Sequence, residues 1–199
     1  MGAPRGAASH WMYAGGSLVL AVVFGLGLLV GRGRGGAAAT PEGASAAETG
    51  APPVAAPDIS NLSPREQFDR LYDRVMRASS SGDNATVERF APMAISAYRM
   101  LDSVDMDARY DVAVIKLHVG DIDGARVLAD TMVRTAPSHL FGYMIRGTVA
   151  RFTGDSAGAR KAGATFLRNY LGEIRKARPE YEKHRTSIDS FKRQVEAAG

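Results

Sequence analysis

The sequence predicts an all-α protein made of an N-terminal transmembrane helix, a flexible linker and a domain of antiparallel helix pairs. The transmembrane helix is indicated by residues 11–31, a run of 21 positions without a charged side chain. The helical domain is indicated by apolar residues that recur at intervals of three and four, and by a seven-residue segment that recurs 34 positions later. Strands are not expected, because the sequence has no useful run of alternating apolar and polar residues and no hairpin dipeptide between β-branched runs.

The composition excludes several classes of protein. The 199 residues are 45% hydrophobic and 23% charged with a net charge of +4, which is ordinary for a globular chain and rules out a collagen-like or wholly disordered one. The absence of cysteine removes disulfide frameworks, thiolate zinc sites and cysteine nucleophiles. The basic side chains are spread along the chain rather than gathered in one patch, so no nucleic-acid partner is expected.

Residues 11–31 have the length and the flanks of a membrane-spanning helix, and residues 1–10 form a short tail before them. At 1.5 Å per residue the segment is about 31 Å long, which matches the hydrocarbon thickness of a bilayer. Trp11 and Tyr13 stand at one end, where amphipathic rings favour the headgroup region, and an arginine follows the other end. The lipid bilayer is therefore the first predicted partner of the chain.

A cleavable signal peptide is the competing interpretation, because residues 37–39 are alanines of the kind found at cleavage sites. However, the apolar run is longer than the apolar part of a typical signal, and Arg32 and Arg34 separate it from the alanines. These features favour an uncleaved anchor. Cleavage near Ala39 would instead release a secreted soluble domain.

The charges beside the span do not orient it, since Arg5 and the terminal amine on one side balance Arg32 and Arg34 on the other. Because anchors near an N-terminus commonly leave the bulk of the chain outside, we expect a single-pass protein of the bacterial inner membrane with a periplasmic C-terminal domain. Gly27 and Gly31 form a small-xxx-small pair on which a second transmembrane helix could pack, although glycine is also tolerated in such spans without a contact.

Residues 32–58 are rich in alanine, proline and glycine and contain almost no large apolar side chain. Such a segment cannot bury enough surface to offset its chain entropy. It is therefore predicted to be a linker that holds the domain of residues 59–199 away from the bilayer.

The first helix of that domain has a clear start signal. Ser63 can accept a hydrogen bond at the helix start, Pro64 fits the first helical position and Glu66 completes a capping box. Apolar residues then recur on one helical face, namely Phe68, Leu71, Tyr72, Val75 and Met76.

An internal repeat is the strongest signal in the chain. The segment GDIDGAR at residues 120–126 recurs as GDSAGAR at residues 154–160, and a period of 34 is that of helix–turn–helix tetratricopeptide repeats. The chain resembles that family at these residues. In the family pattern the Gly-Asp pair joins the two helices of a repeat, Ala125 and Ala159 take the alanine position between helices, and Pro137 takes the proline position.

The resemblance implies an α-solenoid of about three repeats, at about residues 68–104, 106–139 and 140–173. The first repeat is degenerate, because Gly82 precedes Gly120 by 38 residues rather than 34. The later repeats also depart from the pattern, with Arg109 at an aromatic position and Arg146 at a leucine position. Three helix pairs are about the minimum that can bury their apolar faces without further repeats.

A last helix over about residues 179–197 is predicted to cap the array, because the exposed end of a solenoid needs a cover with one polar face. Its apolar residues share one face between many charges: Tyr181, Ile188, Phe191 and Val195.

The resemblance also implies where a partner protein binds. In tetratricopeptide arrays the first helix of each pair lines the concave face, and the family's inward positions here form an apolar and aromatic groove of Tyr72, Met76, Tyr110, Val114, Leu117, Phe141, Met144 and Phe152. Such a groove suits an amphipathic helix or an extended apolar segment. The lysine and asparagine positions of the family's carboxylate clamp fall on Tyr110 and Val114, so that mode is not implied. The alternative is that these side chains pack helix on helix or lie beneath the C-terminal helix.

No catalytic residue, cofactor or metal site is expected from the sequence. The four histidines are scattered without a His-x-x-x-His spacing, and no Walker, kinase or serine-hydrolase signature occurs. Residues 31–36 fit the G-x-G-x-x-G pattern, but the residues that follow show no helical periodicity, so a dinucleotide site is not expected. Asp121 and Asp155 are typical of helix-start residues. The sequence therefore favours a non-catalytic scaffold that binds other proteins, as an accessory, assembly or stabilising subunit of a larger membrane complex. The alternative is a regulatory domain that binds a ligand or peptidoglycan through the same groove.

The predicted anchor can be tested with the full-length chain in a bacterial host. We expect the protein to stay in the membrane pellet after alkaline carbonate extraction, because a span of about 20 apolar residues is not released by breaking ionic contacts. Its intact mass should be that of the uncleaved 21.1 kDa chain. Val22→Arg combined with Val23→Arg should release it, since each arginine near the centre of a span costs about 3 kcal/mol on insertion. A soluble product that begins near residue 40 would show that the segment is a cleaved signal.

Overall fold

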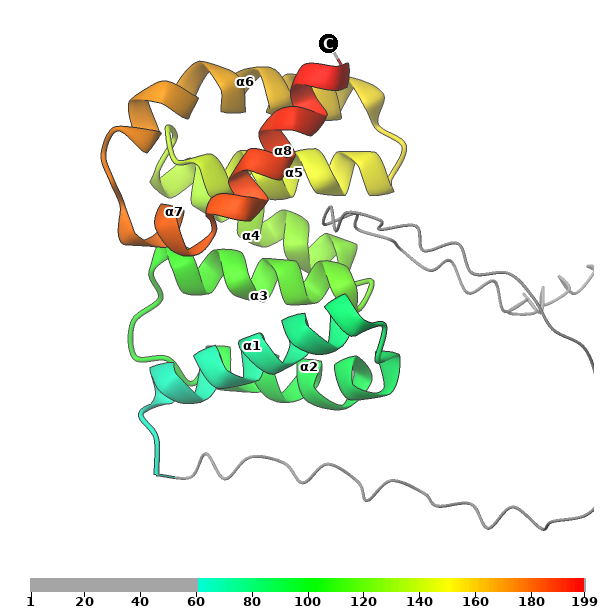
Figure 1. Ribbon diagram of the computed structural model, residues 1–199, viewed down its shortest axis with the longest axis vertical. Helices are drawn as coiled ribbons and strands as arrows, with labels where there is room; N and C mark the ends of the chain where they lie inside the picture. The colour runs from blue at the N-terminus through cyan, green and yellow to red at the C-terminus, as the bar shows by residue number, and fades with distance from the viewer. Residues whose placement is uncertain (1–60, 199) are drawn as a thin grey trace, which may run out of the picture. The chain divides into compact units, whose positions relative to one another are not determined.

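The computed structural model describes residues 61–198, and this part of the chain is entirely helical. It contains eight α-helices and no strand, which confirms the predicted all-α class (Figure 1). The helices are α1 (Pro64–Ser81), α2 (Asn84–Arg99), α3 (Met106–His118), α4 (Ile122–Thr135), α5 (Leu140–Phe152), α6 (Ser156–Ile174), α7 (Pro179–Lys183) and α8 (Arg185–Ala198).

The predicted span of residues 11–31, with its Gly27 and Gly31 pair, and the predicted linker of residues 32–58 lie outside the described residues. Within residues 61–198, no helix combines the length and the apolar character that a membrane crossing requires.

Helix α1 begins with the capping box that the sequence predicts. The amide of Glu66 donates to the hydroxyl of Ser63 over 3.3 Å, and the amide of Ser63 donates to the Glu66 carboxylate over 3.0 Å. Pro64 occupies the first helical position, where its missing N–H costs nothing. These contacts satisfy two of the amides that a helix start leaves without a partner.

The three helix pairs are closed by the same Gly-Asp turn. The glycines Gly82, Gly120 and Gly154 have φ angles of 74°, 78° and 73°, a left-handed conformation that disfavours any residue with a Cβ atom. In each turn the amide of the following aspartate donates to a carbonyl five residues earlier over 2.8–2.9 Å, which ends the first helix. The aspartate carboxylate then accepts the amide three residues later over 2.8–3.0 Å, which starts the second.

The irregular spacing of the first turn has a local cause. Helix α2 has 16 residues where α4 has 14. The loop after α2 covers residues 100–105, whereas the loop after α4 covers only residues 136–139. The backbone geometry of the Gly82 turn is therefore the same as that of the later two, although its distance in sequence differs.

The helix pairs α1–α2, α3–α4 and α5–α6 stack in one direction (Figure 1). The first helices contact one another from pair to pair, α1 with α3 and α3 with α5, and the second helix of each pair packs on the first helix of the next. Helix α3 divides its apolar side chains between two core clusters. Ala108, Val112 and Ile115 belong to the cluster with α1 and α2, while Tyr110 and Ala113 belong to the cluster that extends to α8.

The predicted capping helix over about 179–197 is, in the structure, two helices. His184 separates α7 from α8 with φ −104° and ψ 21°, outside regular helical geometry. The predicted apolar residues still face inward, because Tyr181, Ile188 and Phe191 are buried and Val195 is half-buried. The break turns the chain between α7 and α8 and places the His184 side chain against α3.

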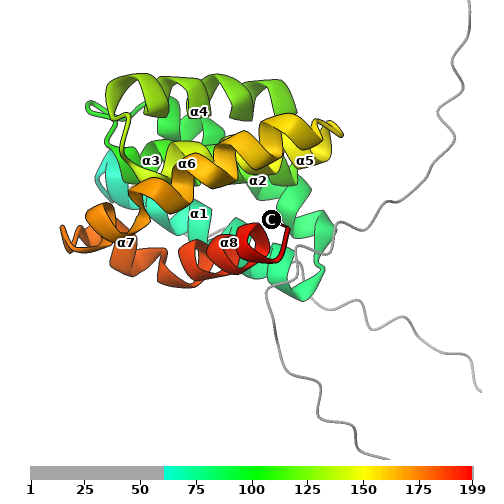
Figure 2. The ribbon, with the colours of Figure 1, turned by 90° about the horizontal axis from the view of Figure 1, so that it is seen from above.

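Two glycines let α8 approach the last helix pair closely. A Cβ atom on Gly147 of α5 would lie 2.7 Å from the Phe191 ring, and one on Gly163 of α6 would lie 2.7 Å from Val195. Larger residues at these positions would push α8 outward. Figure 2 shows α8 on one side of the domain and α4 on the opposite side.

The Gly-Asp turn can be tested by comparing two glycine substitutions in the full-length protein. Gly154→Ala should lower the free energy of unfolding by about 1–2 kcal/mol, since φ is positive and the new Cβ touches nothing, so that only backbone strain changes. Gly172→Ala is the matched control. Gly172 is exposed within α6, and alanine there should raise the free energy of unfolding by up to about 1 kcal/mol.

Urea titration followed by circular dichroism in detergent measures both changes. Destabilisation by Gly172→Ala, or no loss in Gly154→Ala, would contradict the assignment of strain to the turn.

Candidate functional site

The structure places the eight predicted groove residues in two groups. Tyr72, Tyr110, Phe141 and Met144 are buried. Met76, Val114, Leu117 and Phe152 are partly exposed. A partner that approaches the first helices of the pairs therefore meets the second group directly and the first group only if other side chains move.

The buried aromatic residues contact the C-terminal helices. The rings of Tyr110 and Phe141 stack with centroids 4.2 Å apart, and the His184 imidazole meets both edge-on at 4.8 and 5.3 Å. Tyr181 of α7 lies 5.4 Å from Phe141, also edge-on. These side chains thus form an apolar wall between α3, α5 and the α7–α8 junction. This arrangement agrees with the alternative given above, in which the predicted groove residues lie beneath the C-terminal helix. Their role in partner binding stays a prediction.

A cluster of charged side chains adjoins this wall and contains the buried Asp107, Asp111 and His184 and the more exposed Arg65 and Lys183. We call it the acidic cluster. Asp107 and Asp111 are four residues apart on α3, so both carboxylates lie on one helical face. The ammonium of Lys183 donates to an Oδ2 of each over 2.8 Å. His184 Nε2 lies 2.8 Å from Asp107 Oδ1 and 3.1 Å from Asp111 Oδ1, and Arg65 of α1 donates to Asp107 Oδ2 over 2.6 Å.

The cluster shifts the protonation of its members. Burial raises the pKa of Asp107, but hydrogen bonds with His184 and Lys183 outweigh it and hold that pKa at about 2. Burial lowers the pKa of His184, and its contacts with Asp107 and Asp111 more than reverse this, so the pKa lies above the usual value. The imidazole therefore retains its proton more readily than a free histidine does.

Among the described residues, one group of three carboxylate and histidine side chains lies close enough together to hold a metal ion. It consists of Asp107, Asp111 and His184. One ligand atom from each lies within 4.8 Å of the other two. Sequence reasoning missed this set because His184 is 77 residues from Asp107. The only local signal is the Asp-x-x-x-Asp spacing on a predicted helix, which is common on exposed helix faces.

A second polar group fixes α7 at its other end. The carboxylate of Glu173 is 1% exposed and accepts from the hydroxyls of Ser138 over 2.7 Å and Tyr181 over 2.9 Å. Lys176 and Arg178 pair with it, and the Tyr181 hydroxyl accepts the amide of Leu140 over 3.1 Å. Burial raises the pKa of Glu173, but the bonds from Lys176, Ser138 and Tyr181 hold it at about 2.

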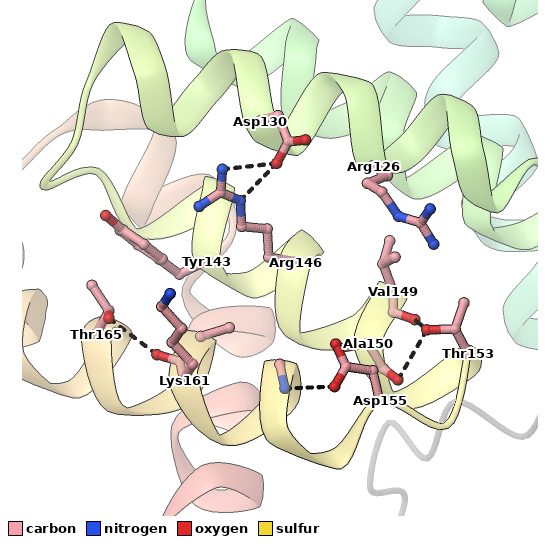
Figure 3. A pocket seen from close by; sticks show the side chains of 12 residues that line it. Arg126, Asp130, Tyr143, Arg146, Val149, Ala150, Thr153, Asp155, Lys161 and Thr165 are labelled. Atoms are coloured by element: carbon pink, nitrogen blue, oxygen red, sulfur yellow. Dashed lines mark hydrogen bonds and ion pairs between the residues drawn. The ribbon is translucent and has the colours of Figure 1, made fainter.

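A separate pocket of about 500 Å³ lies between α4, α5 and α6 (Figure 3). Arg126, Arg146 and Lys161 reach toward it from three different helices, and Arg146 pairs with Asp130 over 2.7 Å. The backbone around it is held by the Asp155 cap of α6. None of the predicted groove residues lines this pocket.

Asp121 and Asp155, predicted as helix-start residues, are confirmed as the N-caps of α4 and α6. The acidic cluster and Glu173 both hold the C-terminal helices.

Comparison with known proteins finds no matching family model, no matching curated protein and no matching solved structure.

The Glu173 contacts predict a specific acid dependence. A carboxylate whose pKa is lowered in the folded state stabilises the fold above its ordinary pKa of 4.5, and this contribution is lost as pH falls from there toward 2. At pH 7, Glu173→Gln should lower the free energy of unfolding by about 1–3 kcal/mol because charged hydrogen bonds are lost. The difference in the free energy of unfolding between this variant and the wild type, which we call the stability gap, should shrink as pH falls below 4.5.

Urea titrations of the full-length chain between pH 7 and pH 3 measure this gap. Glu182→Gln is the control, because Glu182 is 62% exposed and pairs only with Arg185 among the described residues. A gap that does not change with pH would refute the role given to the Glu173 carboxylate.

Proposed function

We propose that this chain is a membrane-anchored, non-catalytic scaffold that binds other proteins as an accessory, assembly or stabilising subunit of a larger membrane complex. The observation that carries the proposal is the Gly-Asp turn, which builds three helix pairs with one backbone geometry. Stacked helix pairs of this kind offer a long surface to a partner rather than an enclosed reaction chamber.

In this proposal the pairs are repeats of the tetratricopeptide type in a short α-solenoid, with α7 and α8 as the cap. The contacts of α3 with α1 and α5 support it, since first helices of successive repeats adjoin in such arrays. The family's alanine position supports it also, because Ala125 is fully buried between helices. Ala159 is partly exposed, as expected for the last repeat, which has no further pair above it.

The anchor and the linker complete the proposal. Residues 11–31 would hold the chain in the bilayer, and residues 32–58 would let the domain reach subunits at some distance from it. The partners we propose are therefore other subunits of a bacterial inner-membrane complex, met on the periplasmic side. Gly27 and Gly31 would contribute where a second transmembrane helix packs on the anchor.

The proposed contact surface consists of Met76, Val114, Leu117 and Phe152, the predicted groove residues that remain partly exposed. The buried Tyr110 and Phe141 would support this surface from below. A polar substitution at the buried rings would disturb the fold, so the partly exposed residues give the sharper test.

The experiment compares complexes isolated from detergent-solubilised native membranes. Cross-linking and quantitative mass spectrometry should recover wild-type protein with the same subunits in a fixed ratio. Met76→Glu combined with Leu117→Glu should lower this recovery about tenfold or more, since charge at the centre of an apolar contact costs at least about 1.4 kcal/mol.

Val127→Glu is the matched control, because Val127 is 65% exposed on α4 and belongs to no predicted surface. It should leave the recovery unchanged. Equal recovery with the double variant, at unchanged helix content, would place the contact elsewhere. A variable subunit ratio in the wild type would argue for a free scaffold rather than a permanent subunit.

A further inference from the structure

Three potential ligand atoms converge in the acidic cluster. Asp107 Oδ1, Asp111 Oδ1 and His184 Nε2 lie within 4.8 Å of one another, with the nitrogen 2.8 and 3.1 Å from the two oxygens. The two carboxylates come from one face of α3, and the imidazole comes from the break between α7 and α8. The site therefore joins segments that are far apart in the sequence.

One of these atoms lacks a partner. Asp111 is fully buried, and its Oδ1 accepts no hydrogen bond among the described residues. His184 Nε2 can carry only one hydrogen, which its closer contact to Asp107 Oδ1 uses. A buried carboxylate oxygen that accepts no hydrogen bond costs free energy, so this lone pair is available to a bound cation.

The other two carboxylate oxygens are already engaged. Lys183 donates to Oδ2 of both aspartates, and Arg65 donates to Oδ2 of Asp107. These bonds orient the carboxylates and leave both Oδ1 atoms toward the imidazole. Carboxylates that bind a metal ion commonly accept such hydrogen bonds from side chains that do not touch the metal.

The side chains connected to the cluster carry an excess of negative charge when the partly exposed Asp69 and Asp105 are counted. Arg65 binds Asp69 and Asp105 as well as Asp107, and Lys183 binds Asp107 and Asp111. The connected group thus holds four carboxylates against two permanent cations when the imidazole is neutral. One proton on His184 offsets half of the excess, whereas one divalent ion would offset all of it.

We propose that Asp107 Oδ1, Asp111 Oδ1 and His184 Nε2 bind one divalent transition-metal ion, with zinc as the best match. Zinc takes histidine nitrogen and carboxylate oxygen at about 2.0–2.2 Å, which places neighbouring ligand atoms about 3.3 Å apart in a tetrahedral site. The nitrogen–oxygen separations here need to widen by only about 0.2–0.5 Å to reach that value. The ion would displace the proton of His184, and water would supply the fourth ligand.

The inference goes beyond the proposed scaffold function and does not depend on it. A metal at this point ties α3 to the α7–α8 junction and holds the C-terminal helices against Tyr110 and Phe141. It contradicts the expectation from histidine spacing, because the single histidine ligand is 77 residues from Asp107 and only the fold brings them together.

The experiment uses the full-length chain in detergent, stripped with a chelator and titrated with zinc chloride in a calorimeter. We expect one zinc ion per chain. Asp111→Asn and His184→Gln should each weaken binding by at least about tenfold. His118→Gln is the control, because His118 lies outside the cluster with its Nδ1 3.1 Å from Ser79 Oγ, and it should bind zinc as the wild type does.

Binding of no zinc by the wild type, or equal binding by all variants, would overturn the proposal. A second measurement does not depend on variants that fold. X-ray absorption of the wild-type zinc complex should show one histidine and otherwise oxygen ligands. Two or more histidines would reveal binding elsewhere on the chain and would equally overturn it.

Discussion

The reversal of the chain at glycine with positive φ is the constraint on which the rest of the domain depends. At Gly82, Gly120 and Gly154 the same turn ends one helix and starts the next, because the following aspartate donates its amide backward and accepts an amide with its carboxylate. The turn thereby supplies hydrogen-bond partners at both helix ends from its own residues. The two helices of each pair then meet at a fixed angle, and their apolar faces can stack on the next pair.

The C-terminal helices are held by a different kind of interaction. The apolar wall, which contains Tyr110, Phe141 and Tyr181, provides the contact area. The acidic cluster and Glu173 provide the hydrogen bonds and ion pairs that fix the orientation of these helices. Burying charges is costly, and here Asp107 and Glu173 each accept hydrogen bonds from more than one side chain, whereas Asp111 accepts one from Lys183. The position of α7 is therefore set by hydrogen-bond geometry, and that of α8 by close packing at Gly147 and Gly163.

The sequence predicts those features that are encoded locally. The capping box at Ser63, the N-caps at Asp121 and Asp155 and the helical class all follow from residues within one or two turns of each other. The acidic cluster does not, since His184 is 77 residues from Asp107 and the Asp-x-x-x-Asp spacing is common on helices. Nor does periodicity reveal that Tyr110 and Phe141 lie beneath α7, or that the cap breaks at His184, because both result from contacts between distant segments.

The division of α3 between two core clusters has a consequence for how the domain loses its structure. Ala108, Val112 and Ile115 face one neighbouring pair while Tyr110 and Ala113 face the other. Separation of α3 from either neighbouring helix pair would expose one side of α3 to water. Because both neighbouring pairs pack on α3, loss of either pair is expected to destabilise this helix, so the three pairs are expected to unfold as one cooperative unit.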